Sequence, residues 1–286
     1  HPAKLHGGLF LEIMERYTKP GDVILDPMAG IGTALLATMY GRSVVLNELE
    51  PHFLETIPKS WAIIQRNGPA LGHTMGSVLI LRGDARCLPL NSADHAIFSP
   101  PYEGFTEAND EQRFAASGKP FTKRLGYTRP VDAIVSSPPY EGTRSDGGGD
   151  MAGAGEGGFH AYTNEAPDTW HTQRDQTNIG NQRGDAYWES MRLCYQECWR
   201  VLRPGGLMVL VLKGFTRDGQ YVDLSGQTAQ MVESLGFVHF DTWQRELWSL
   251  SFWRILQQRR DPAAFDDRLK YETILAFRKE QTPNGE

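Results

Sequence analysis

The spacing of apolar residues predicts strands and helices that alternate along most of the chain. Short apolar runs at 23–26, 43–47, 77–81 and 207–212 are typical of strands buried on both faces. Apolar residues three and four positions apart predict helices over 9–17, 187–202 and 228–235. Strands near 237–243 and 271–277 are expected to pair antiparallel. The pattern predicts an α/β fold with a doubly wound, Rossmann-like sheet, mostly parallel with an antiparallel C-terminal strand.

A glycine turn follows the first apolar run. Gly30 and Gly32 allow the backbone to approach a ligand closely, and Thr33 lies at the entrance of the next helix. The phosphate-binding patterns G-x-G-x-x-G and G-K-[ST] are not present here. Glu48 ends the second run, and Asp84 follows the third. Because an acid after the second strand of a doubly wound sheet can bind ribose hydroxyls, this spacing predicts a nucleoside-binding site.

The tetrapeptide Ser-Pro-Pro-Tyr occurs twice, each time after a short apolar run and before Glu-Gly. The first copy is Ser99-Pro100-Pro101-Tyr102 after 93–98, and the second is Ser137-Pro138-Pro139-Tyr140 after 131–136. Prolines stiffen a turn and leave carbonyl groups free to accept hydrogen bonds, while a tyrosine offers a flat face for a base. Only one copy can end the fourth strand of the sheet. The first copy follows Asp84 after a short connection of the usual length, whereas the second has the better strand and a more ordinary distance to the next helix. We favour the first copy, so that the second lines the substrate cleft or is a duplicated relic.

Together these segments resemble the S-adenosylmethionine-dependent amino-methyltransferases that act on DNA. The DPMAGIGT segment resembles that family's D-P-F-x-G-S-G-T loop, from which Met28 and Ile31 depart. The chain start at His1 and Pro2 resembles the segment before that loop. Ser-Pro-Pro-Tyr resembles the catalytic motif in the form more typical of cytosine-N4 than of adenine-N6 enzymes. The resemblance covers most of 1–102 and 187–280.

The resemblance implies direct methyl transfer from S-adenosylmethionine to the amino group of an extruded base, most simply cytosine N4, with no metal. Glu48 would then hold the ribose, and Asp84 would bond the adenine amino group. Tyr102 would stack on the base, while Ser99 and the Pro100 carbonyl accept hydrogen bonds from its amino group. The implied catalytic residues are Ser99, Pro100, Pro101 and Tyr102, with Ser137, Pro138, Pro139 and Tyr140 as the second candidate copy. The implied cofactor contacts are His1, Pro2, Asp26, Pro27, Met28, Gly30, Gly32, Thr33, Glu48, Asp84 and Ala85.

Four alternatives remain open from the residues. Adenine-N6 methylation of DNA and methylation of an amino group in RNA would use a similar proline loop. Methylation of a protein glutamine shares the amide chemistry, but its motif usually begins with Asn. A nucleic-acid-binding module with the same fold and no catalysis belongs to a different functional class, distinguished by cofactor binding without methyl transfer.

The net charge of −6 restricts how this chain could bind DNA. A uniformly acidic surface would repel phosphates, so we expect local basic patches to make the contacts. Eight glycines within 142–158 argue against a packed core there. We therefore predict a catalytic domain of residues 1–103 and 186–286, with 104–185 an irregular insertion that recognises the target. Candidate phosphate contacts are Lys119, Lys123, Arg124, Arg129, Arg144, Arg174, Arg183, Arg254, Arg259 and Arg260.

The remaining composition narrows the chemistry. Cys87, Cys194 and Cys198 have no metal-binding spacing, and Cys87 does not follow a proline as the nucleophile of a cytosine-C5 methylase usually does. There is no apolar run of membrane-spanning length and no signal peptide in the sequence, so we expect a cytoplasmic protein. The sequence leaves the target site, the strandedness of the substrate and the oligomeric state open.

Overall fold

The computed structural model describes residues 5–90, 131–136, 179, 182–217, 220–247 and 266–280. The helices are α1 (Gly7–Tyr17), η1 (Thr33–Tyr40), α2 (Pro51–Asn67), α4 (Asp185–Val201), α5 (Leu224–Ser234) and η5 (Asp267–Lys270). The strands are β1 (Val23–Asp26), β2 (Ser43–Glu48), β3 (Val78–Arg82), β4 (Ala133–Ser136), β5 (Leu207–Leu212), β6 (Phe215–Arg217), β7 (Gln220–Val222), β8 (Phe237–Glu246) and β9 (Tyr271–Lys279).

Seven strands form one sheet in the order β3-β2-β1-β4-β5-β9-β8. The first five in this order pair parallel, and β9 pairs antiparallel with both β5 and β8. The chain runs outward from β1 through β2 to β3, whereas β4 and β5 lie on the other side of β1. The strand order therefore reverses between β1 and β4. In open α/β sheets, ligands bind in the crevice beyond the carboxyl ends of the strands at such a reversal.

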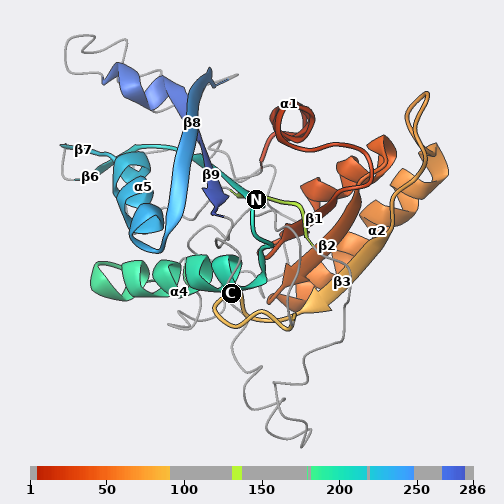
Figure 1. The fold of residues 1–286 in the computed structure, drawn as a ribbon, viewed down its shortest axis with the longest axis horizontal. Coiled ribbons are helices and arrows are strands. Elements are labelled where there is room, and N and C mark those ends of the chain that lie inside the picture. Colours follow the sequence, from red (N-terminus) through yellow and green to blue (C-terminus); the bar gives the residue numbers. More distant parts are fainter. Residues whose placement is uncertain are drawn as a thin grey trace, which may run out of the picture.

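Helices cover both faces of the sheet, as the strands' buried side chains require (Figure 1). On one face, α4 and α5 contribute Tyr187, Met191 and Val232 to a core that includes Leu25 and Val45. On the other face, α1, η1 and α2 bring Phe10, Leu35 and Ile57 against Ile24 and Leu46. Consecutive residues of β1 and β2 thus enter different cores, because side chains alternate along a strand. The doubly wound α/β prediction and the antiparallel pair near the C-terminus are confirmed.

The prediction that 93–98 forms the fourth strand is wrong. Ala133–Ser136 occupies the place between β1 and β5, with Leu25 beside Ile134 and Val135 beside Val209. A central parallel strand is buried on both faces, and Ala133, Ile134 and Val135 are fully buried. The other run has Asp94 and His95 in sequence, and such polar residues are costly at these positions. Residues 93–98 themselves lie outside the described part of the chain.

This finding also changes the predicted division of the chain. β4 lies within 104–185, which we expected to be an irregular insertion, so residues 133–136 belong to the sheet instead. The rest of that predicted division stays a prediction.

Side-chain contacts fix the outer elements to the sheet. The Tyr17 hydroxyl at the end of α1 donates to Asp241 of β8 at 2.8 Å and accepts from the Trp243 indole at 2.9 Å. Burial and the Asp241 hydrogen bond raise the pKa of Tyr17 to about 12. On the neighbouring strand, β9, the Lys279 ammonium group donates to the Trp199 and Leu202 carbonyls at the end of α4, at 2.5 and 2.6 Å.

Candidate functional site

The candidate site lies at the carboxyl edge of the sheet, where the loops after β1, β2 and β3 meet. Backbone hydrogen bonds join the loop after β1 and the loop after β3 to the last two residues of β2. The Ala29 N–H, in the loop after β1, donates to the Asn47 carbonyl of β2 at 3.0 Å. The Gly83 N–H, after β3, donates to the Glu48 carbonyl at 3.1 Å. Asp26, Glu48 and Asp84, which are far apart in sequence, therefore belong to one loop cluster, as their positions at strand ends predicted.

The glycine loop leaves β1 at Asp26 and enters η1 at Thr33. The Asp26 carboxylate is buried and accepts the Met28 N–H at 3.2 Å, which turns the chain immediately after the strand. Gly30 and Gly32 have φ values of 52° and 83°, a left-handed region that favours glycine. A Cβ at Gly32 would lie 3.0 Å from Leu35, whereas one at Gly30 would have nothing within 4 Å. Gly30 therefore borders open space among the described residues.

Glu48 holds the glycine loop through its buried carboxylate. Its Oε2 accepts the Gly30 N–H at 2.6 Å, and its Oε1 accepts the N–H groups of Leu49 and Glu50 at 2.8 and 2.9 Å. Burial raises the pKa of Glu48, and the three backbone hydrogen bonds oppose that rise. A carboxylate offers about four lone-pair sites, so Oε2 can accept a further donor while it holds the loop.

Asp84 and its neighbours form the side of the cluster beyond β3. The Asp84 carboxylate accepts the backbone N–H of Arg86 at 2.8 Å and pairs with the Arg86 guanidinium at 2.6 Å. Ala85 is buried in the core. The Arg86 partnership was not anticipated from the sequence, although a basic residue two positions after the acid is a visible signal. Any ligand contact by Asp84 has to coexist with this ion pair.

Asn47 is a site residue that the sequence analysis did not identify. Its side-chain amide donates to the carbonyls of Pro27 and Gly83, both at 2.9 Å, so it joins the loop after β1 to the loop after β3. In the sequence Asn47 is only the polar end of an apolar run. The sequence nevertheless contained a signal. Buried strands normally carry apolar side chains, so an Asn just before the final acid of such a strand indicates hydrogen bonds to its amide.

The structure does not describe either proline motif, but it does describe β4, the strand that precedes the second copy. Both copies, Ser99–Tyr102 and Ser137–Tyr140, lie outside the described residues, as do His1 and Pro2. Ser136, which precedes the second copy in sequence, is the last residue of β4, and β4 pairs parallel with β1, the strand that leads into the glycine loop. Of the candidate phosphate contacts, Arg183 is among the described residues and is exposed.

Two of the cysteines lie in the core, whereas Cys87 lies in the loop after β3, where its N–H donates to the Asp84 carbonyl at 3.0 Å. Cys194 and Cys198 are buried in α4, where burial raises the pKa of both thiols, and Cys87 is exposed. Within the described ranges, no three His, Cys, Asp or Glu residues are grouped so that they could hold a metal ion. None of the helices described is long and apolar enough to cross a membrane.

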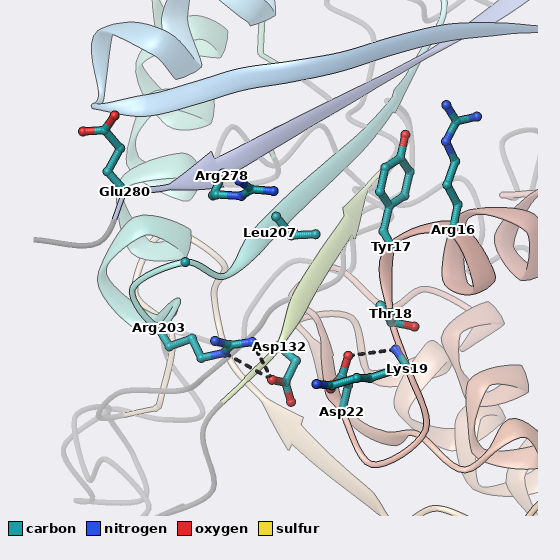
Figure 2. Close-up of a pocket in the computed structure, with 11 residues that line it drawn as sticks. Arg16, Tyr17, Thr18, Lys19, Asp22, Asp132, Arg203, Leu207, Arg278 and Glu280 are labelled. Atoms are coloured by element: carbon teal, nitrogen blue, oxygen red, sulfur yellow. Dashed lines mark hydrogen bonds and ion pairs between the residues drawn. The ribbon is translucent and has the colours of Figure 1, made fainter.

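A separate pocket of about 770 Å³ opens at the opposite edge of the sheet, at the amino ends of β1, β4 and β5 (Figure 2). Its lining includes one ion pair and two carboxylates that accept backbone N–H groups. Arg203 pairs with Asp132 at 3.0 Å, and the Asp22 carboxylate accepts the Lys19 N–H at 2.9 Å. The other Asp132 oxygen accepts the Val23 N–H at 2.8 Å. The pocket lies at the sheet edge away from the glycine loop, and the Asp132 carboxylate joins the start of β1 to the loop before β5.

Comparison with solved structures finds similar folds at low sequence identity. A SAM-dependent methyltransferase from Methanosarcina mazei is 12% identical, with 94% of this chain and 98% of that chain covered and a TM-score of 0.49. TrmN from Thermus thermophilus is 13% identical with a TM-score of 0.46, over 96% of this chain but 49% of that one, so the chain spans about half its length. The [4+2]-cyclase SpnF is 13% identical with a TM-score of 0.49, over 96% and 81% of the two chains. No protein-family model and no curated protein sequence matches the chain.

These neighbours include a methyltransferase and a cyclase, so a likeness at this level does not decide the reaction. The function is therefore inferred from the residues of the site.

Proposed function

We propose that this chain is an S-adenosylmethionine-dependent amino-methyltransferase that acts on DNA, with cytosine N4 as the target atom. One observation carries the proposal. β4 pairs with β1, so the chain enters Ser137-Pro138-Pro139-Tyr140 at the same sheet edge at which it enters the glycine loop. A loop for binding a nucleoside and a loop suited to an amino group thus start from neighbouring strands.

Two features support S-adenosylmethionine as the ligand: the open space beside Gly30 among the described residues, and the hydrogen-bond acceptors on Glu48 and Asp84. A Cβ at Gly30 would project into open space, so the absence of a side chain keeps that space available to a ligand. Glu48 has an acceptor site left for a ribose hydroxyl, and Asp84 can accept from an adenine amino group. When bound, S-adenosylmethionine supplies an electrophilic methyl group.

The second proline motif, rather than the first, is the catalytic copy in this proposal. We favoured Ser99–Tyr102 because of its distance from Asp84, but that argument assumed that 93–98 was the fourth strand. With β4 at Ala133–Ser136, the motif that directly follows the strand beside β1 is Ser137–Tyr140. The first copy then becomes the candidate for lining the substrate cleft.

In this proposal the motif acts by positioning and by hydrogen bonding. The target base stacks on Tyr140, while the Ser137 hydroxyl and the Pro138 carbonyl accept hydrogen bonds from its amino group. These bonds draw the nitrogen lone pair out of conjugation with the ring. With S-adenosylmethionine held by the glycine loop, its methyl group would be supplied to this nitrogen, and the proton displaced from the nitrogen would pass to solvent water. Such a reaction needs orientation and electrostatic stabilisation and no covalent enzyme intermediate.

The preference for DNA and for cytosine N4 rests on the resemblance of the motif. Ser in its first position favours cytosine N4 over adenine N6 and over a protein glutamine. A similar loop would also serve an RNA amino group, and the fold without catalysis would serve a binding module. These alternatives differ in product, so a single assay separates them.

The test is to incubate the purified protein with methyl-labelled S-adenosylmethionine and either unmethylated DNA or RNA, followed by nucleoside mass spectrometry. We expect labelled N4-methylcytosine from DNA. N6-methyladenine as the sole DNA product would refute the base assignment, and label confined to RNA would refute the DNA substrate. Cofactor binding with no labelled nucleoside from either polymer would refute a nucleic-acid substrate, and label in an added protein extract would then separate a protein methylase from a binding module.

A further inference from the structure

Asn47 connects the two loops on either side of it through one side chain. Its two amide hydrogens go to the Pro27 carbonyl after β1 and the Gly83 carbonyl after β3, both at 2.9 Å. Its own backbone carbonyl accepts the Ala29 N–H at 3.0 Å. The residue therefore makes three hydrogen bonds to loops that are far apart in sequence, and it is completely buried.

The buried Asn47 side chain carries an energetic penalty that an apolar side chain packed in its place would not have. The side-chain oxygen, Oδ1, has no hydrogen-bond partner among the described residues. A buried acceptor without a partner is unfavourable, and an apolar side chain of similar size would avoid it. The orientation of the amide is set by its donors, because the opposite orientation would place Oδ1 against two carbonyl oxygens. What Asn offers here, and an apolar residue does not, is a fixed distance between the two loops.

Asn47 and Glu48 act on the loops from different sides. They are successive residues of β2, so their side chains point to opposite faces of the sheet. Glu48 holds the Gly30 N–H, while Asn47 holds the Pro27 and Gly83 carbonyls. The loop after β1 is thus fixed at two points, and the Asn47 side chain ties it to the loop that carries Asp84.

We propose that Asn47 is a positioning residue that holds the glycine loop and the Asp84 loop at the spacing required to bind one nucleoside between them. The inference rests on the proposed use of these loops by S-adenosylmethionine. If it is correct, loss of the Asn47 amide weakens cofactor binding but leaves the methyl-transfer step and the affinity for DNA unchanged.

The experiment compares Asn47→Asp, which keeps the size but loses both donors, and Asn47→Ser, which is too short to reach both carbonyls. The matched control is Ser43→Ala, which removes a buried hydroxyl at the other end of β2, where its Oγ lies 3.0 Å from the Ser77 Oγ. Calorimetry measures the Kd for S-adenosylmethionine, and steady-state kinetics give kcat and the KM for DNA. We expect the Kd to rise about tenfold in both Asn47 variants, as the loss of two hydrogen bonds implies, with kcat at saturating cofactor and the KM for DNA within about twofold of wild type.

A merely structural role predicts a different result, namely a lower melting temperature with an unchanged Kd, as expected for Ser43→Ala. An unchanged Kd in both folded Asn47 variants, or an equal rise in Ser43→Ala, would overturn the proposal. Wild-type protein that does not bind S-adenosylmethionine would instead refute the proposed function.

Hydrogen exchange in the wild-type protein gives a second test that does not depend on the variants folding. The amides of Ala29 and Gly83 lie in the two loops that Asn47 joins. If the loops open together, these amides have equal protection factors, and cofactor raises both equally. Protection factors that differ by more than about tenfold, equivalent to independent opening of the loops, would overturn the proposal.

Discussion

Replacing Gly30 by alanine should separate the stability of the protein from its ability to bind the cofactor. Gly30 has a φ of 52°, and a Cβ built there has nothing within 4 Å. Among the described residues the added methyl group therefore meets no protein atom, and the folding cost is that of placing an L-residue in the left-handed region. That cost is about 1 kcal/mol, which corresponds to a melting temperature lower by about 2–4 °C for a chain of this size.

The effect on binding should be much larger, because the same methyl group projects into the space assigned to S-adenosylmethionine. Gly30 also donates its N–H to Glu48 at 2.6 Å, so the loop cannot move away without losing that bond. We expect the Kd to rise by more than about a hundredfold, equivalent to about 3 kcal/mol. Calorimetry at a temperature where the variant is folded measures this directly.

The control is Gly72→Ala, at a turn between α2 and β3. Gly72 has a φ of 82° and, like Gly30, nothing within 4 Å of a built Cβ. It should lower the melting temperature by a similar amount and leave the Kd unchanged. Gly30→Ala protein that binds the cofactor as tightly as wild type would show that the glycine loop does not contact it, and the reasoning from the open Cβ position would be refuted.

Two further predictions concern the contacts that fix the outer elements. The pKa of Tyr17, raised to about 12 from 10.0 chiefly by burial, means that the unfolded chain ionises first as the pH rises. The contribution of Tyr17 to stability is therefore complete below pH 10 and is lost as the pH passes through about 12. The difference in melting temperature between wild type and Tyr17→Phe should shrink from pH 9 to pH 12. A difference that stays constant over this range would contradict the prediction. Lys279→Met removes the two hydrogen bonds at the end of α4 and should lower the free energy of unfolding by about 1–3 kcal/mol in denaturant titrations, because charged donors make strong bonds. Arg192→Met, at an exposed ion pair of α4, should cost clearly less than Lys279→Met, and equal losses from the two variants would count against the explanation.

The sequence was most informative where strand ends carry polar residues. Because parallel strands align their carboxyl ends, the sequence assigns the glycine turn, Glu48 and Asp84 to one edge of the sheet. The side-chain partners at that edge could not be predicted. The bonds from Asn47 to Pro27 and Gly83 depend on the exact register of three strands, which the apolar pattern does not specify.

The placement of the fourth strand at 93–98 failed for a related reason. Both proline motifs follow an apolar run, and chain distance from Asp84 was a poor guide because β3 and β4 are joined by a long connection. Burial would have been the better guide. The run at 131–136 has a single polar residue before its last position, Asp132, which is used at the amino end to bind the Val23 N–H and Arg203. The run at 93–98 would have to accommodate both Asp94 and His95.

The most direct test of the account is the single-turnover rate of methyl transfer to DNA at saturating cofactor and DNA, measured for Tyr140→Ala and Tyr102→Ala. Because β4 leads into Ser137–Tyr140 beside the glycine loop, the account predicts that Tyr140→Ala loses the methyl-transfer step while its Kd for S-adenosylmethionine stays at the wild-type value. Tyr102→Ala should retain a near-normal rate once DNA is saturating. A Tyr102→Ala variant that is inactive in this step, beside a Tyr140→Ala variant that transfers methyl groups normally, would contradict the assignment of the catalytic loop to the end of β4.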